Sequence, residues 1–489
     1  MSAEHQIRNN YHVRCVNWLL TTVADATSEE KKRELNAFVK ETLESRPGGD
    51  SLATGFFAQR EVKDALAANN NILPIFCDLY PLDDLGISLE SACDKVCQDR
   101  NKQLMILKNV FLKQLATHPE LSSLQQVGND SKAIFEWLQA NILVLESVTK
   151  LQGNFFWMMP PEICLFKNLQ DLLLSQSMIK KLSRIIFANL PQLRLLDLSM
   201  NSLESIPEDV FTSLSQLQRL NLSYNPITNI AKGSFQGLSQ LKYLHISHTA
   251  YKSLDPSLTI SEGAFENLSG LKYLYLTANK MYKFSAPMFT GLSALEHLDL
   301  SDNMYIEGDY NLALPDRTFA DLSNLKYLNL SRNLIDTISS ETFAGLSALE
   351  HLDLSFTRIL TIQNGAFSHL THLIHLLLCV EKITAISTQT FAGLSQVKQL
   401  RLDQYRQGDR SLSTGIFSEL PALQLLQLRS FYGNTIKIPP GTFTGLTHVV
   451  GFECNGDYNG KLQLAVATET LHELEGLEQL FLKHSTITM

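Results

Sequence analysis

The stretch from Leu193 to Asn225, LRLLDLSMNSLESIPEDVFTSLSQLQRLNLSYN, contains one pattern twice, and this repetition decides the fold. Three leucines and an asparagine recur after a step of 24 residues: Leu193, Leu196, Leu198 and Asn201, then Leu217, Leu220, Leu222 and Asn225. The first position of the pattern recurs along the chain at Leu169, Leu241, Leu271, Leu295, Leu325, Leu349, Leu373, Val397, Leu423, Val449 and Leu477. A regular period over this length predicts a repeat array rather than one compact core.

The spacing inside each unit has a physical interpretation. In Leu-x-Leu, two side chains point to one side of a short strand and the middle residue points outward. Strands of successive units then stack as a parallel sheet, and neighbouring units bury what one unit cannot bury alone. A phenylalanine precedes each return to the sheet, at Phe187, Phe211, Phe235, Phe265, Phe289, Phe319, Phe343, Phe367, Phe391, Phe417 and Phe443. We expect the asparagine to bond backbone groups that the turn leaves buried.

These residues resemble the leucine-rich-repeat family, in the subtype LxxLxxLxLxxNxLxxLxxxxFxxL, over about residues 165–489. The resemblance implies an α/β repeat solenoid, curved, with a parallel sheet on its concave face. We therefore expect the solenoid to span 146–489, with about 13 repeats after a degenerate first unit. The asparagine is replaced at Thr249, Thr357, Glu381, Tyr405, Phe431, Asp457 and Ser485. Because most replacements follow residue 350, we expect a less regular C-terminal half.

Residues 1–145 lack the repeat and show helical spacing instead. Three apolar stripes carry this spacing: Val13, Val16, Leu20 and Val23; Leu104, Leu107, Phe111 and Leu115; Ile134, Leu138, Ile142 and Leu145. Asp130 or Ser131 is a candidate N-cap for the last of them. We predict an all-helical N-terminal domain over 1–145 that covers the open end of the array, as terminal repeats require.

The junction with the repeats, from Trp137 to Ile163, resembles that of leucine-rich-repeat proteins from intracellular bacteria, chlamydia-like and Legionella-like. Residues 72–100 resemble an F-box, but the usual Leu-Pro opening and the following tryptophan are absent. An ordinary helical bundle explains the same apolar spacing. Cys93 and Cys97 stand four apart without a second ligand pair, so a metal site is not expected there.

Composition excludes several other classes of protein. The net charge is -9, which argues against a general nucleic-acid-binding or membrane-surface protein. The sequence has no apolar run long enough to cross a membrane and no apolar signal-peptide run near Met1. Seven scattered cysteines suit free, buried thiols in a reducing compartment. We expect a cytoplasmic protein, or one secreted into a host cell by a non-classical route.

No motif for nucleotide binding, zinc-dependent hydrolysis or serine hydrolysis occurs, so we expect neither catalysis nor a cofactor.

The residues of the strands that point outward are more informative about function. One column holds Tyr243, Tyr273, His297, Tyr327, His351 and His375. The neighbouring column holds His245, Tyr275, Asp299, Asn329, Asp353 and Leu377. Aromatic side chains are enriched at protein interfaces, so we predict a protein-binding surface there. Duplication of the repeat would explain the regular spacing of these residues, but not why aromatic rings occupy outward positions.

The sequence therefore favours a scaffold that binds a partner protein through its concave face, and the bacterial resemblance suggests an effector acting on host proteins. The predicted binding residues are Tyr243, His245, Tyr273, Tyr275, His297, Asp299, Tyr327, His351, Asp353 and His375. The alternative is a substrate receptor of a cullin-type ubiquitin ligase that uses a degenerate F-box at 72–100.

Overall fold

The computed structural model describes residues 105–110, 125, 127, 131–156, 159, 161–249, 257–281, 284–303, 314–380, 386–404, 410–430, 435–456, 462–467 and 469–488. The chain forms two compact units. The first comprises residues 1–197, 201–203 and 210–216, and the second comprises 198–200, 204–209 and 217–489.

The described part of the first unit has short helices followed by three parallel strands. Its elements are α7 (Ser131–Ala140), α8 (Ile142–Ser147), β1 (Lys150–Gln152), η3 (Pro161–Leu165), β2 (Asp171–Leu173), α9 (Arg184–Ala188) and β3 (Leu195–Asp197). Leu151, Leu172 and Leu196 align across the strands and are fully buried. The predicted helical stripe is present here, since Ile134, Leu138 and Leu145 are buried on α7 and α8.

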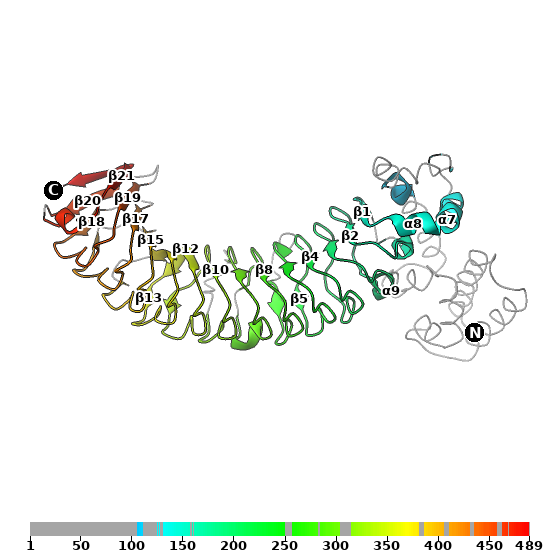
Figure 1. Cartoon of the computed structure of the whole chain (residues 1–489), viewed down its shortest axis with the longest axis horizontal. Coiled ribbons are helices and arrows are strands. Elements are labelled where there is room, and N and C mark those ends of the chain that lie inside the picture. The colour runs from blue at the N-terminus through cyan, green and yellow to red at the C-terminus, as the bar shows by residue number, and fades with distance from the viewer. Residues whose placement is uncertain are drawn as a thin grey trace, which may run out of the picture. The chain divides into compact units, whose positions relative to one another are not determined.

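The second unit is a solenoid built from parallel strands. The main strands that follow each other in its sheet are β4 (Arg219–Asn221), β6 (Tyr243–His245), β8 (Tyr273–Tyr275), β9 (His297–Asp299), β10 (Tyr327–Asn329), β12 (His351–Ile359), β14 (His375–Val380), β15 (Gln399–Gln404), β17 (Leu425–Ser430), β19 (Gly451–Gly456) and β21 (Gln479–Lys483). Figure 1 shows these strands along one long side of the unit, opposite β5 and β13.

Smaller parallel sheets and two short 3-10 turns are formed by the segments that follow the main strands in sequence. These elements are β5 (Asn229–Ile230) with β7 (Thr259–Ile260), β11 (Thr337–Ile338) with β13 (Thr361–Ile362), β16 (Arg410–Ser411), β18 (Thr435–Ile438), β20 (Leu462–Val466) and β22 (Ser485–Thr488), η5 (Ala286–Phe289) and η7 (Leu471–Glu473). The predicted parallel-sheet solenoid is therefore confirmed, with little helix among the described residues of this unit.

The phenylalanines form the predicted spine of the core. All of those named above are at most 1% exposed. In the second unit their rings contact one another from repeat to repeat, with centroids 6.0 Å apart for Phe235 and Phe265 and 5.8 Å apart for Phe343 and Phe367. Further ring contacts join Phe265 to Phe289, Phe289 to Phe319, Phe391 to Phe417 and Phe417 to Phe443, so aromatic packing links most neighbouring repeats of this unit.

The asparagines bond the backbone as predicted. The amide of Asn303 donates to the Leu276 carbonyl at 3.0 Å and to the Leu300 carbonyl at 2.8 Å, and its oxygen accepts from the Asn279 backbone N–H at 2.8 Å. The residue before each asparagine has a positive φ, for example 58° at Asp302. This left-handed residue turns the chain out of the strand, and the buried amide bonds the groups left exposed by the turn.

In the C-terminal half, the departure from the repeat pattern takes the form of longer strands. Strands β14, β15, β17 and β19 have six residues each, compared with three in β6, β8, β9 and β10. They end at Val380, Gln404, Ser430 and Gly456, directly before positions where asparagine is replaced. Without the asparagine turn the chain stays extended for longer, so the departure from the pattern lengthens the sheet.

Several predictions fall outside the described residues. These include most of the N-terminal domain over 1–145, the F-box-like segment 72–100, and Cys93 and Cys97. The cysteines that the structure does describe, Cys164, Cys379 and Cys454, are buried thiols, as predicted.

Candidate protein-binding surface

The structure aligns the predicted outward residues in two adjacent columns on the sheet of the second unit. Strand register pairs neighbours of the first column in the order Tyr243, Tyr273, His297, Tyr327, His351 and His375. We call this set the ring column. The second column aligns in the order His245, Tyr275, Asp299, Asn329, Asp353 and Leu377. The two columns together are called the ring face below.

The rings of the first column stack on one another in pairs. Ring centroids are 4.4 Å apart for Tyr243 and Tyr273, 4.3 Å for His297 and Tyr327, and 4.3 Å for His351 and His375, with interplanar angles of 1°, 0° and 7°. Tilted contacts of 5.9 Å and 6.1 Å connect the pairs. Because the stacking direction runs from strand to strand, ring faces cover each other and ring edges point away from the sheet.

This stacking explains how aromatic side chains stand on an outward face. Each ring of the column is partly buried rather than fully exposed. Polar side chains continue the column at both ends, which sequence reasoning did not foresee. The Arg219 guanidinium lies 4.6 Å from the Tyr243 ring centre, and His375 Nδ1 lies 2.9 Å from Gln399 Oε1. The column thus offers a partner hydroxyl groups, imidazole nitrogens and ring edges.

The second column carries hydrogen-bonding groups beside the rings. Asp299 Oδ1 accepts from the Ser301 backbone N–H at 2.9 Å, and Asp353 Oδ1 accepts from that of Ser355 at 2.7 Å. The Tyr275 ring lies 5.1 Å from the His297 ring, which connects the two columns laterally. All predicted site residues therefore lie on one continuous surface.

Burial changes the acid–base properties of this surface. It lowers the pKa of His297, an effect that nearby Asp299 opposes. Burial also lowers the pKa of His351, with a further lowering by His375 and an opposing effect of Glu350. The pKa of Tyr327 is raised by burial first and then by Asp299 and Asp353. The lowered pKa values keep His297 and His351 mainly neutral at pH 7.

A buried ion pair on β15 escaped the sequence analysis. Arg401 lies in line with Leu377 and donates from Nε and Nη2 to the two carboxylate oxygens of Asp403, at 2.8 Å and 2.6 Å. The Asp403 side chain is 1% exposed, and burial raises the pKa of its carboxyl against the effect of Arg401. The sequence signal is Arg-x-Asp, whose two side chains lie on the same side of a strand. The repeat pattern predicts a strand too short to include both residues, and only the longer β15 aligns them.

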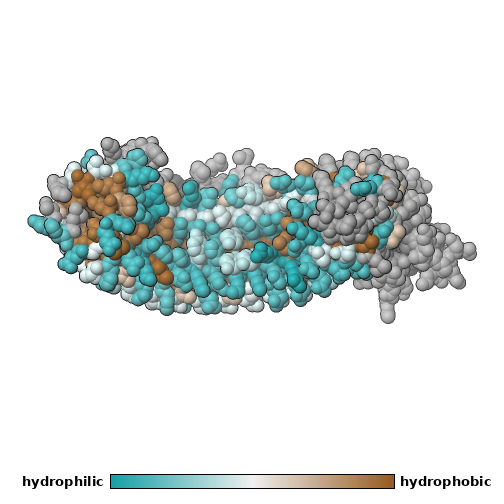
Figure 2. Space-filling model, turned by 45° about the horizontal axis from the view of Figure 1, so that its top comes forward, coloured by the Kyte–Doolittle hydropathy of each residue, from teal (hydrophilic) through white to brown (hydrophobic). Residues whose placement is uncertain are grey.

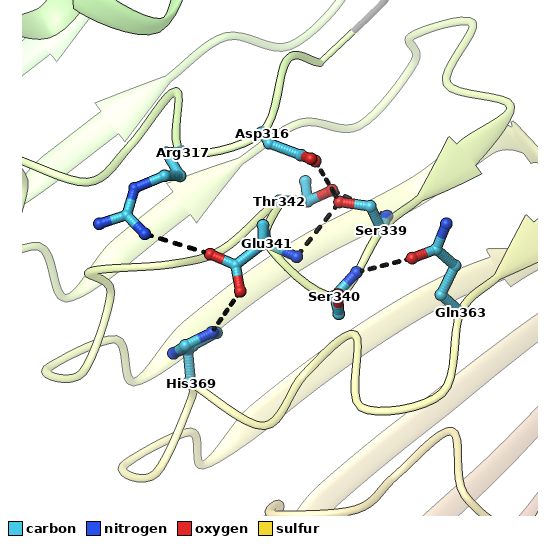
Figure 3. Close-up of polar contacts among 8 residues, drawn as sticks. All are labelled: Asp316, Arg317, Ser339, Ser340, Glu341, Thr342, Gln363 and His369. Carbon is cyan, nitrogen blue, oxygen red and sulfur yellow. Dashed lines mark hydrogen bonds and ion pairs between the residues drawn. The ribbon is translucent and has the colours of Figure 1, made fainter.

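Another polar cluster lies on the return segments around β11 (Figure 3). Glu341 contacts Arg317 at 3.3 Å and His369 at 3.8 Å. The Ser339 hydroxyl donates to Asp316, and the Ser339 backbone N–H donates to Thr342 Oγ1 at 2.9 Å. The same backbone-to-hydroxyl bond recurs at Ser387. These contacts hold turns of adjacent repeats together, so we assign this cluster a structural role.

Among the residues that the structure describes, no three histidine, cysteine or acidic side chains come together to hold a metal ion. No helix within the same described ranges has the length and hydrophobicity needed to cross a membrane.

Comparison with known proteins identifies the repeat. Residues 192–250, 257–305, 304–359 and 349–404 match the family model described as leucine rich repeat. A solved TLR13–ssRNA13 complex is similar at 22% identity and a TM-score of 0.33, over 70% of this chain and 63% of the length of that one. An internalin, InlF of Listeria monocytogenes, is similar at 18% identity and a TM-score of 0.40, over 69% of this chain and 88% of its own. No curated protein sequence gives a significant match.

Proposed function

Because this chain is a leucine-rich-repeat protein, we propose that it is a scaffold that binds a partner protein through the ring face. Solenoids of this kind present extended surfaces on which a partner can lie across several repeats. The observation that carries the proposal is the unbroken ring column from Tyr243 to His375. Tyrosine and histidine edges combine contact area with hydrogen bonding at little cost in side-chain entropy.

Site-specific photo-cross-linking tests the proposal. A photo-reactive amino acid replaces His245, which is exposed on the ring face, and in a matched control it replaces His369, which belongs to the Figure 3 cluster. We expect a protein to be captured from a cell lysate at position 245 and not at position 369. Capture at position 369 alone, or equal capture at both, would exclude the ring face as the binding surface.

The captured protein then allows a quantitative test. Tyr273→Phe and Tyr327→Phe keep the stacked rings and remove only the hydroxyl groups at the outward edge. Loss of a central hydrogen-bonding group at an interface typically costs about 1–2 kcal/mol, which is about a five- to thirty-fold loss of affinity. Wild-type affinity in the double variant, measured by titration calorimetry, would count against the proposal.

Two finer hypotheses rest on sequence resemblance alone. The resemblance to proteins of intracellular bacteria suggests an effector that acts on a host protein, either in the cytoplasm or after non-classical secretion. Capture of a partner from host-cell lysate, but not from lysate of the source cell, would support the effector hypothesis. The ubiquitin-ligase alternative predicts binding of a cullin adaptor to 72–100, which a direct binding assay with purified adaptor would test.

A further inference from the structure

Two carboxylates on the ring face carry charge that the fold does not require. In the second column, Asp299 and Asp353 each accept the backbone N–H of the residue two positions later. Asn221 and Asn329 make the same bond from the same column, at 3.1 Å and 3.0 Å. A neutral amide therefore satisfies the turn as well as a carboxylate does, so the negative charges have another cause.

The surroundings of Asp299 favour a strong interaction with a cation. Strand register places it between Tyr275 and Asn329, and its charge acts on the pKa values of Tyr275, His297 and Tyr327. Partly buried rings limit access of water to the carboxylate, and lower local polarity strengthens an ion pair formed there. Tyrosine rings also attract cations.

Among the residues that the structure describes, neither Asp299 nor Asp353 forms an ion pair with a basic side chain. Lys272, which directly precedes the ring column on β8, pairs with Glu296 at 2.6 Å rather than with either aspartate. On the face drawn in Figure 2, hydrophobic side chains gather toward the C-terminal end. In that part of the chain, Leu480, Phe481 and Leu482 of β21 are 43%, 52% and 43% exposed. The ring face therefore suits a polar, positively charged partner better than an apolar one.

We propose, building on the proposed function, that the partner presents basic side chains to Asp299 and Asp353 from an extended segment that runs across the strands. The two aspartates are two strands apart in register, which is about 10 Å at about 4.8 Å per strand. An extended segment in the polyproline II conformation advances about 3.1 Å per residue and presents every third side chain to the same side, so basic residues three positions apart match this distance. The segment is thus of the type Arg-x-x-Arg, or the same with lysine.

A synthetic peptide with two arginines three positions apart, flanked by glycine and serine, serves as the probe for the intact chain. The control peptide has citrulline, which is isosteric and neutral, in place of both arginines. We expect the arginine peptide to bind about tenfold more tightly in fluorescence anisotropy at low salt, and the difference to shrink at high salt. Equal binding of the two peptides, or no measurable binding of either, would overturn the proposal.

Protein variants test the same inference from the other side. Asp299→Asn with Asp353→Asn keeps both turn hydrogen bonds and should lower affinity for the arginine peptide about tenfold, with an unchanged unfolding midpoint. Asn329→Asp adds a carboxylate between them and should raise affinity about threefold. Unchanged affinity in the double asparagine variant would refute the basic partner. If that variant also binds the cross-linked protein normally while the tyrosine variants do not, the proposed function stands and only this inference fails.

Discussion

The imidazole of His297 lies face to face on the ring of Tyr327, with centroids 4.3 Å apart and parallel planes. The two residues are direct partners on neighbouring strands, β9 and β10. The opposite side of the Tyr327 ring contacts His351 in a tilted arrangement. Cross-strand pairs of this kind stabilise a sheet, so the ring column contributes to the fold as well as to the surface.

Tyr327→Ala should therefore lower stability, although the residue is on the outward side of the sheet. Loss of two ring contacts and of a partly buried ring should reduce the free energy of unfolding by about 1–2 kcal/mol. Tyr327→Phe keeps the ring and should stay within about 0.5 kcal/mol of wild type. Urea unfolding followed by circular dichroism measures both. A Tyr327→Ala midpoint equal to wild type would show that the stack contributes no stability.

Leu328 on β10 and Lys326, which lies just before that strand, provide a sharper contrast. Leu328 is fully buried and Lys326 is exposed. Leu328→Ala should cost about 2–5 kcal/mol, because it leaves a cavity in the continuous core. Lys326→Ala should stay within about 0.5 kcal/mol. Denaturant unfolding compares them directly, and equal midpoints would mean that the inward and outward positions are misassigned.

Two glycines with positive φ separate backbone strain from steric conflict. A Cβ on Gly345, where φ is 91°, would lie 2.7 Å from Ala320 Cα, in the neighbouring repeat. A Cβ on Gly415, where φ is 67°, would meet nothing within 4 Å. Gly415→Ala should cost about 1 kcal/mol from strain alone, and Gly345→Ala distinctly more because the backbone must move. Thermal unfolding measures the loss of stability in both variants. Similar losses would show that Ala320 moves aside freely and would contradict the predicted steric conflict.

The sequence predicts the main strands, the phenylalanine spine and the asparagine bonds because each follows from a residue type at a fixed repeat position. Leu-x-Leu determines which residues point inward, so the columns of the ring face also follow. Stacking of Tyr243 on Tyr273 does not, because it depends on side-chain rotamers. The Arg401–Asp403 pair needed the longer β15, which appears only where the asparagine turn is absent.

The stability of the second unit should fall as the pH is lowered from 7.5 to 5.5. Burial lowers the pKa values of His297 and His351 in the folded chain, whereas both histidines titrate near 6.5 when unfolded. In this range the unfolded chain binds protons more readily than the folded chain. The stabilisation is therefore complete above about pH 6.5 and is lost as pH falls toward the lowered values.

The double variant His297→Gln, His351→Gln isolates this effect, because glutamine does not titrate. Its urea midpoint at pH 7.5 should lie below that of wild type, since the ring stacks are lost, but should change less between pH 7.5 and 5.5. Tyr327→Phe, which keeps both histidines and the ring between them, is the matched control and should retain the wild-type pH dependence. The same protonation places positive charge beside Asp299, so affinity for the arginine peptide should also weaken toward pH 5.5. Parallel pH profiles for the wild type and the double variant would assign the acid sensitivity to other groups.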